Sequence, residues 1–274
     1  MDKNLVRKPA VAGQFYPATA DLINKQIGSF LRPDPPVKKE VIGCMLPHAG
    51  YLYSGMVAVQ TVAQVIVKDT VVLLGPNHTG RGSAFSLMSA GEWQTPLGNV
   101  AIDEDLAQAI LAGSQYLEED DQAHYKEHSL EVELPILQYF RKDFKIVPIS
   151  FGVDDPDALK AIGRSIAHAI KGLKRESSTL LVASSDMTHY ESASSARKKD
   201  DIAIHAIVTL DEKALREAIH GSNITMCGYL PVIVMITAAK ELGATKGELV
   251  KYATSGDVTK DNSSVVGYAG MVIY

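Results

Sequence analysis

Apolar residues along this chain gather in short continuous runs, and longer segments with helical periodicity lie between the runs. Four runs have the length of a strand, at residues 41–46, 71–74, 145–151 and 179–184. A continuous apolar run bounded by turn residues is typical of a strand that is buried on both faces of a sheet. Between the runs, apolar residues recur every three or four positions, which predicts amphipathic helices.

The remaining elements complete a regular alternation. The sequence predicts helices over residues 19–31, 54–65, 103–111, 129–140, 155–171, 193–210, 211–218 and 229–242. It predicts further strands over residues 84–88, 249–255 and 264–273, with loops over residues 91–99 and 118–129. Strands that alternate with helices without a break in composition favour a single three-layer α/β/α domain over residues 1–274, with a mainly parallel central sheet.

Two local features refine this picture. Residues 1–17 are punctuated by Gly and Pro but contain Phe15 and Tyr16, so we expect an extended arm that packs on the core. The helix after residues 41–46 is expected to begin at Ser54, because a serine hydroxyl is a favoured helix N-cap.

Three of the eight histidines closely follow a predicted strand. They are His48, His78 and His189, and each lies in a loop rich in Gly, Pro or Ser. Ligands of open α/β sheets bind just outside the carboxyl ends of the strands, so we expect these histidines to share one site. Imidazoles more than about 12 Å apart would exclude that site, because metal ligands lie ~2 Å from their ion. For each histidine alone, a local hydrogen-bonding role remains the alternative.

Two neutral imidazoles leave a metal ion short of ligands, so a further donor is required. The candidates are Glu131, Asp186, Asp257 and Cys227. A carboxylate gives the donor set of non-haem iron oxygenases, whereas a thiolate suits copper, zinc or iron. Cys227 lies in a turn before a predicted helix, where the helix dipole is expected to lower the pKa of its thiol. Its alternative role is that of a small core residue, which is the role we expect for Cys44.

Three residues can support such a site. His128 and Glu131 are spaced to lie on one side of a helix start, where they can bind a metal or orient a catalytic histidine. The alternative is a helix-capping arrangement that includes Ser129. Tyr53, which closely follows His48, can bind a substrate or simply pack.

Composition and charge exclude several classes of protein. The net charge is −5 and the basic residues are scattered, which argues against a nucleic-acid partner. The longest apolar run, at residues 229–239, is too short to span a membrane, and no secretion signal opens the chain. Two cysteines in unlike settings argue against a disulfide framework. These features together predict a cytoplasmic protein without a membrane partner.

Seven short motifs occur in order along the chain, namely RKPAVAGQFYP, PHAGYLYSG, LGPNHTG, EHSLEVELP, SSDMTHY, MCGYLP and YATSGD. Together they resemble the Memo family, named for a mediator of cell motility. The microbial members of that family are grouped with AMMECR-type and radical-SAM proteins, as protein B of the AmmeMemoRadiSam system. The motifs run from residue 7 to residue 257. The fold that this resemblance implies is that of the class III extradiol, or LigB-type, ring-cleaving dioxygenases.

The resemblance also implies a set of site residues. It implies one iron or copper ion at His48, His78 and Cys227, with zinc as a further candidate, and it implies His189 as the catalytic base beside Asp186. A thiol stands here in place of the carboxylate ligand of the ring-cleaving enzymes, which argues against ring cleavage itself. Some members of the family have His or Arg soon after this cysteine, where this chain has Tyr and Leu. A functional link to AMMECR-type and radical-SAM proteins is implied as well.

Three functions fit these observations. The leading hypothesis is a metal-dependent redox enzyme that acts on a small molecule, with proton transfer by His189. The second is a metal-free hydrolase in which Cys227 is the nucleophile, His189 its base and Asp186 the orienting group. The third is a non-enzymatic binding or scaffold protein that holds a small molecule or peptide in the same pocket. A fold alone does not choose among them.

Overall fold

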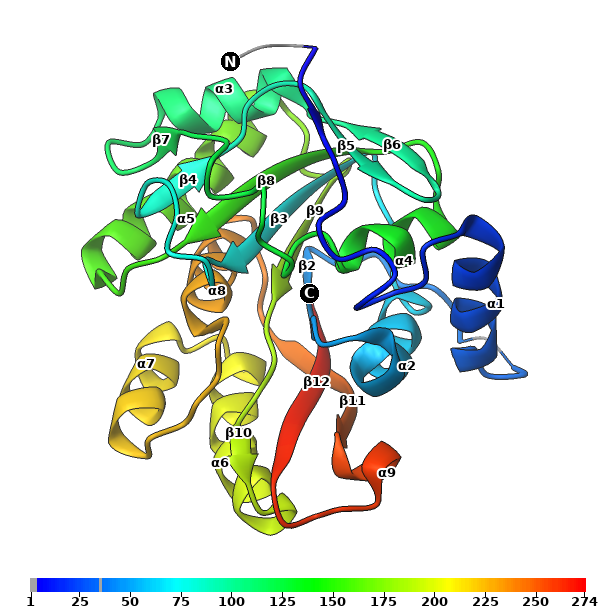
Figure 1. The fold of residues 1–274 in the computed structure, drawn as a ribbon. Helices are drawn as coiled ribbons and strands as arrows, with labels where there is room; N and C mark the ends of the chain where they lie inside the picture. Colours follow the sequence, from blue (N-terminus) through cyan, green and yellow to red (C-terminus); the bar gives the residue numbers. More distant parts are fainter. Residues whose placement is uncertain (1–3, 35) are drawn as a thin grey trace.

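Four parallel strands form the centre of the sheet in a computed structural model that describes residues 4–34 and 36–274 (Figure 1). In spatial order they are β2 (Gly43–Leu46), β9 (Thr179–Ser184), β3 (Thr70–Pro76) and β8 (Lys145–Phe151). They correspond to the four apolar runs, and every residue in them except Lys145 is buried. Since β9 lies between β2 and β3, the strands that precede His48 and His78 are not direct neighbours.

Strands of mixed direction extend this centre on both sides. On one side, β12 (Val265–Ile273) pairs antiparallel with β2, and β12 also pairs with β11 (Gly247–Thr254) and β10 (His189–Glu191). On the other side, β4 (Phe85–Leu87) pairs antiparallel with β8, and β7 (Glu118–Glu119) pairs with β4. The larger sheet of the described residues therefore has nine strands and a parallel centre.

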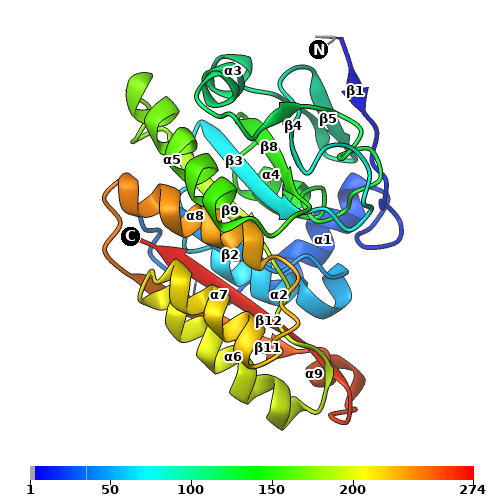
Figure 2. The ribbon, with the colours of Figure 1, turned by 90° about the vertical axis from the view of Figure 1, so that its left-hand side faces the viewer.

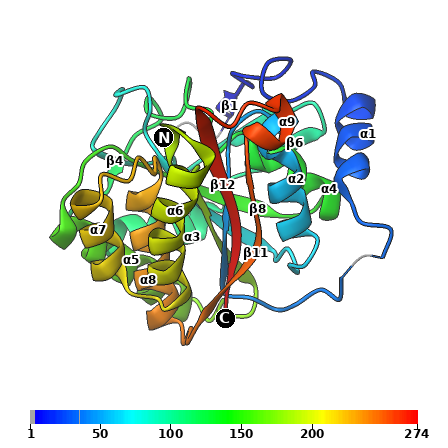
Figure 3. The same ribbon diagram turned by 90° about the horizontal axis from the view of Figure 1, so that it is seen from below.

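Helices cover both faces of this sheet (Figures 2 and 3). One face is covered by α3 (Glu104–Ala112), α5 (Pro156–Gly172), α6 (Ala193–Val208), α7 (Glu212–Gly221) and α8 (Tyr229–Glu241). The other face is covered by α1 (Ala20–Phe30), α2 (Tyr51–Val62) and α4 (Glu133–Phe140), and α9 (Gly256–Thr259) is a single turn after β11. This arrangement confirms the predicted three-layer α/β/α class. Within the described ranges, every helix is too short or too polar to cross a lipid bilayer.

The helix after β2 begins three residues earlier than the sequence predicts. Its N-cap is Gly50 rather than Ser54, and the Ser54 hydroxyl donates a hydrogen bond to the Ala49 carbonyl at 2.7 Å. The first helical N–H, that of Tyr51, donates to the Phe15 carbonyl at 2.7 Å. The extended N-terminal arm therefore satisfies the start of this helix, a tertiary contact that the local sequence does not reveal.

The segment that the sequence predicts as a loop around the only tryptophan forms a β-hairpin instead. Its strands are β5 (Glu92–Thr95) and β6 (Gly98–Ala101), and β1 (Val6–Arg7) adds to β5 in parallel. The Pro and Gly residues that suggested a loop occupy the hairpin turn, where Gly98 has φ +122°. This small sheet joins the N-terminal arm to the rest of the protein.

Candidate metal centre

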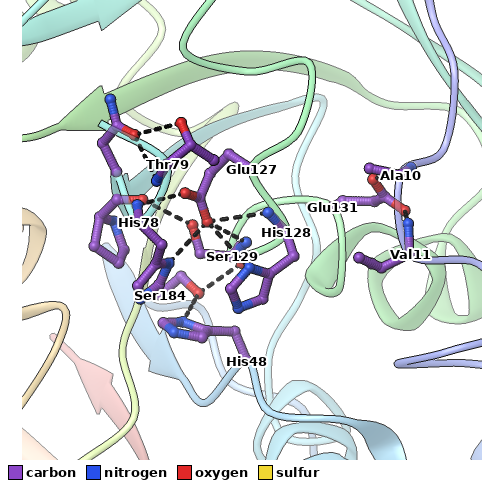
Figure 4. Close-up of polar contacts among 12 residues, drawn as sticks. Ala10, Val11, His48, His78, Thr79, Glu127, His128, Ser129, Glu131 and Ser184 are labelled. Carbon is purple, nitrogen blue, oxygen red and sulfur yellow. Dashed lines mark hydrogen bonds and ion pairs between the residues drawn. The ribbon is translucent and has the colours of Figure 1, made fainter. Parts of the chain in front are cut away.

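Imidazole rings from three loops meet beyond the carboxyl ends of the central strands (Figure 4). His48 follows β2, His78 follows β3, and His128 lies in the loop before α4. The ring centroid of His48 lies 5.2 Å from that of His78 and 5.5 Å from that of His128, and the His78 and His128 centroids are 4.8 Å apart. The rings of His48 and His78 are thus close enough to share one ion.

Cys227 reaches the same point from the turn before α8. Its Sγ lies 3.3 Å from His48 Nε2, and one donor atom each of His48, His78 and Cys227 lie within 4.8 Å of one another. Two ligands with bonds of ~2.0 Å and ~2.3 Å to one tetrahedral ion are separated by about 3.6 Å. The structure therefore brings together the three residues that the sequence predicts as metal ligands, with a donor set that fits zinc, iron or copper.

A glycine permits the close approach of Cys227 to the sheet. A Cβ atom on Gly228 would lie 2.2 Å from the Ser184 carbonyl oxygen and 2.5 Å from Cβ of Ser185. The Gly228 N–H donates to the Ser185 hydroxyl at 2.9 Å, which fixes the turn against the end of β9. A larger residue after Cys227 would force this turn or the end of β9 to move.

Glu127, for which the sequence predicts no role, holds His78 in place. Its carboxylate lies 2.9 Å from His78 Nδ1 and accepts a hydrogen bond from the His78 backbone N–H at 2.6 Å. Burial opposes ionisation of Glu127, but the hydrogen bond and charge of His78 prevail and lower its pKa to about 2. Against the effect of burial, Glu127 also raises the pKa of His78, so His78 offers Nε2 as a ligand atom once that nitrogen has lost its proton, an arrangement common around protein-bound metals.

His48 is held by a neutral partner. Its Nδ1 lies 2.8 Å from the hydroxyl oxygen of Ser184, the last residue of β9. Burial, followed by the nearby His78 and His128, keeps the pKa of His48 well below its usual range. A neutral imidazole is the form that binds a metal, so this environment favours ligation.

Asp186 orients the loop of His48 and does not hydrogen-bond to the ring of His189. Its Oδ1 accepts from the backbone N–H groups of His48 at 2.8 Å and Ala49 at 3.3 Å, and its own N–H donates to Cys227 Sγ at 3.3 Å. Burial raises the pKa of Asp186 to about 6, although the charge of His189 acts in the opposite direction. The expectation that Asp186 orients His189 therefore needs correction.

Thr225 is the residue that orients His189. His189 Nδ1 lies 2.9 Å from the Thr225 carbonyl oxygen, and the His189 backbone N–H donates to the Thr225 hydroxyl at 2.7 Å. Because a carbonyl only accepts, Nδ1 carries the hydrogen of this contact, and Nε2 is the ring nitrogen that remains for exchange with a substrate. Thr225 lies two residues before Cys227, so these hydrogen bonds tie His189 to the turn that carries the thiol.

The pKa of the Cys227 thiol differs from the sequence-based expectation. Burial and the nearby charge of Asp186 raise the pKa of Cys227, whereas the helix dipole was expected to lower it. Cys227 is nevertheless half-buried, whereas Cys44 is fully enclosed in β2, as predicted for a core residue. A bound cation would stabilise the thiolate, so ionisation of this thiol is coupled to metal binding.

Comparison with known proteins places the chain in a family. The model of the family described as Memo-like protein matches residues 7–272. The chain belongs to the Memo-like family. It is 43% identical over 269 residues to a MEMO1 family protein of Methanosarcina barkeri, which covers 98% of this chain and 100% of the relative. It is 45% identical over 268 residues to a MEMO1 family protein of Aquifex aeolicus, covering 97% of this chain and 98% of the relative.

A solved structure gives a weaker likeness. It is the crystal structure of an uncharacterized Escherichia coli protein, with a TM-score of 0.48 and 13% sequence identity. The match covers 85% of this Memo-like chain and 99% of the other chain.

Glu131, expected to support the site, binds the N-terminal arm of this Memo-like chain (Figure 4). Its carboxylate is 2.5 Å from the Arg7 guanidinium and accepts hydrogen bonds from Ala10 N–H, Val11 N–H and the Tyr16 hydroxyl. The arm in turn places the ring of Phe15 4.7 Å from that of His128. Glu131 therefore binds the arm and contacts none of the described imidazoles. Burial lowers the pKa of His128, and the charge of Glu131 raises it only as a minor cause.

The other predicted candidates lie at the margin. Tyr53 is on the first turn of α2, where its side chain is partly exposed. Asp257 accepts a hydrogen bond from the Thr254 N–H at 2.7 Å at the start of α9, which explains it as a local structural residue.

Proposed function

We propose that this Memo-like protein binds one iron or copper ion at His48, His78 and Cys227 and acts as a metal-dependent oxidoreductase on a small molecule. The observation that supports the proposal is the convergence of two imidazoles and a thiol within 4.8 Å of one another. Both imidazoles are held through Nδ1, which leaves Nε2 of each ring for ligation. Zinc fits the same donors and is the further candidate.

The protein's own residues supply positioning and proton transfer. A bound ion of this kind supplies electron transfer and activation of a coordinated substrate. Ser184 and Glu127 fix the planes of the His48 and His78 rings, and burial keeps His48 neutral. His189 is held through Nδ1 by the Thr225 carbonyl, so its Nε2 is the nitrogen that exchanges a proton with a substrate.

The metal-free hydrolase receives less support. The imidazole next to Cys227 Sγ is that of His48, whose opposite ring nitrogen bonds to a serine and not to a carboxylate. Asp186 and His189 make their hydrogen bonds to other groups. The described contacts thus lack the nucleophile, base and orienting acid of that mechanism. A cytoplasmic location and a functional link to AMMECR-type and radical-SAM proteins stay predictions.

The decisive experiment is metal stoichiometry. Protein purified without an affinity tag is reconstituted anaerobically with Fe(II), Cu(I) or Zn(II), desalted and analysed for metal. We expect about one ion per chain in the wild type and loss of binding in the variants His48→Ala, His78→Ala and Cys227→Ser. His168→Ala is the matched control, because His168 is exposed on α5. A wild type that retains none of the three metals would overturn the proposal.

A further inference from the structure

The Ser184 hydroxyl, which fixes the His48 ring in the proposed function, also contacts two groups on the side away from the metal ligands. Figure 4 shows Ser184 beside His48 and Ser129. The Ser184 hydroxyl oxygen is 2.8 Å from His48 Nδ1, 2.7 Å from the Ser129 carbonyl oxygen and 3.0 Å from Glu133 Oε1. Ser184, Ser129 and Glu133 are all fully buried. The Ser184 hydroxyl therefore has three protein partners.

Counting protons assigns the direction of each hydrogen bond. A hydroxyl donates one hydrogen bond and accepts up to two. The Ser129 carbonyl can only accept, and two oxygens 2.7 Å apart repel unless a proton lies between them. The proton of Ser184 is therefore committed to Ser129. In its two remaining hydrogen bonds, the Ser184 oxygen therefore has to be the acceptor.

These two hydrogen bonds determine where His48 and Glu133 carry a proton. His48 must carry its hydrogen on Nδ1, so that its Nε2 lone pair faces Cys227. Glu133 must carry a proton on Oε1, and so must be a neutral carboxylic acid. This assignment follows from the geometry around one serine.

The other oxygen of Glu133 gives independent support. Glu133 Oε2 is buried and has no hydrogen-bond partner among the residues that the structure describes. A buried ionised carboxylate with an oxygen left without a partner is far more costly than a neutral acid in the same place.

The groups that face Glu133 do not compensate a negative charge. They are the Cys44 thiol on β2, the Tyr51 hydroxyl on α2, the Ser184 hydroxyl on β9, and Asp186 just beyond β9. The Tyr51 hydroxyl donates to the Val132 carbonyl at 2.8 Å and not to Glu133. Burial raises the pKa of Glu133 well above its usual range, and Asp186 raises it further.

We propose that Glu133 is a positioning residue that remains protonated at neutral pH, donates to Ser184 and keeps the space behind His48 free of charge. An ionised carboxylate at this position would stabilise the imidazolium form of His48, which binds no metal. The two ligand histidines are therefore supported differently. The Nδ1 atom of His78 contacts the Glu127 carboxylate, whereas that of His48 contacts Ser184, which accepts a hydrogen bond from neutral Glu133. The proton assignment stands on the contacts alone, and its consequence for ligation rests on the proposed function.

The first test compares the wild type with Glu133→Gln, which keeps a neutral donor of similar shape but cannot titrate. The unfolded wild type loses its Glu133 proton above a pH of about 4.5, while the folded protein keeps it. Above that pH, folding therefore takes up one proton, and the folded state loses stability as the pH rises. We expect the wild-type folding constant, relative to that of the variant, to fall about tenfold per pH unit between pH 5.5 and 7.5. A ratio that stays constant over this range would overturn the proposal.

A second measurement needs no variant. Infrared spectra of wild-type protein labelled with carbon-13 glutamate should show the carbonyl band of a protonated glutamic acid at pH 7, where exposed glutamates are ionised. Absence of that band would overturn the proposal even if Glu133→Gln fails to fold.

Zinc titration separates this proposal from the proposed function. Ser184→Ala should weaken zinc binding by about 10–100-fold, and Glu133→Gln should bind within about threefold of the wild type. If Glu133→Gln folds but no longer binds zinc, a neutral hydrogen-bond donor at position 133 is not sufficient for metal binding, and the proposed role of Glu133 is wrong. If the wild type binds no metal, the metal function fails while the pH ratio and the infrared band still decide the protonation of Glu133.

Discussion

His124 offers a sharp test of how burial controls protonation in this protein. Its side chain is completely buried, and neither ring nitrogen has a hydrogen-bond partner among the described residues. The ring lies 5.7 Å from that of Trp93, and the Arg7 guanidinium donates to the His124 carbonyl. Burial, followed by the charge of Arg7, lowers the pKa of His124 to about 4.

The magnitude follows from that shift. The unfolded chain binds a proton at His124 near pH 6.5 and the folded protein only near pH 4, so the folded state loses stability as the pH falls through this window. A difference of about 2.5 pKa units corresponds to about 3 kcal/mol below pH 4. About 2 kcal/mol of this is already lost at pH 5.

The perturbation is His124→Phe, which keeps a planar ring and removes both polar atoms. At pH 7, the variant gains stability from the removal of two buried polar atoms without partners and loses stability from the strain of a larger ring. Because these effects oppose each other, its free energy of unfolding should differ little from that of the wild type. Urea unfolding at pH 7, 6 and 5 should show that the wild type loses about 2 kcal/mol relative to the variant. His168→Gln, an exposed substitution on α5, is the control that should show no such divergence. Parallel stability curves for wild type and His124→Phe would refute the reasoning.

Three further predictions concern the site and its support. An alkylating reagent should modify half-buried Cys227 before fully buried Cys44, and added metal should protect Cys227, whereas equal labelling would contradict a role for its thiol as a ligand. Glu127→Gln should weaken metal binding about 10–100-fold by calorimetry with the fold intact, and an unchanged affinity would remove Glu127 from the site. Arg7→Met should cost about 3–5 kcal/mol in urea unfolding, because it leaves the buried Glu131 carboxylate without its cation. The double variant Arg7→Met/Glu131→Gln should recover part of that loss, and a cost below about 1 kcal/mol for Arg7→Met would count against the buried pair.

The fold was largely predictable because its central strands are marked by uninterrupted apolar runs. Burial on both faces leaves few alternatives for such segments, and the position of His48 and His78 after them follows from the direction of parallel strands. The hairpin of β5 and β6 was missed because its turn residues look like those of a loop. Its partner, β1, lies about 85 residues earlier in the chain, so local patterns do not reveal the pairing.

The support of the site was less predictable, since it depends on contacts between distant segments. Glu127 stands next to His128 in the sequence, and an acid beside a candidate histidine was the signal available for it. Ser184 and Glu133 carry no such signal, because a serine at a strand end and an acid in a predicted helix are both ordinary. The role of Glu131 was misjudged for the same reason, since its partner Arg7 lies in the N-terminal arm.

The order of strands in the sheet has a consequence for synthesis of the protein. Strand β2, which presents His48, lies between β9 and β12, and β12 follows β2 by more than 200 residues. At ribosomal rates of ~5–20 residues per second, β2 waits on the order of ten seconds or more for this second neighbour. During that time an apolar strand is open to chaperones or to association with other chains. A nascent chain therefore cannot complete the sheet around His48 until β12 has left the ribosome.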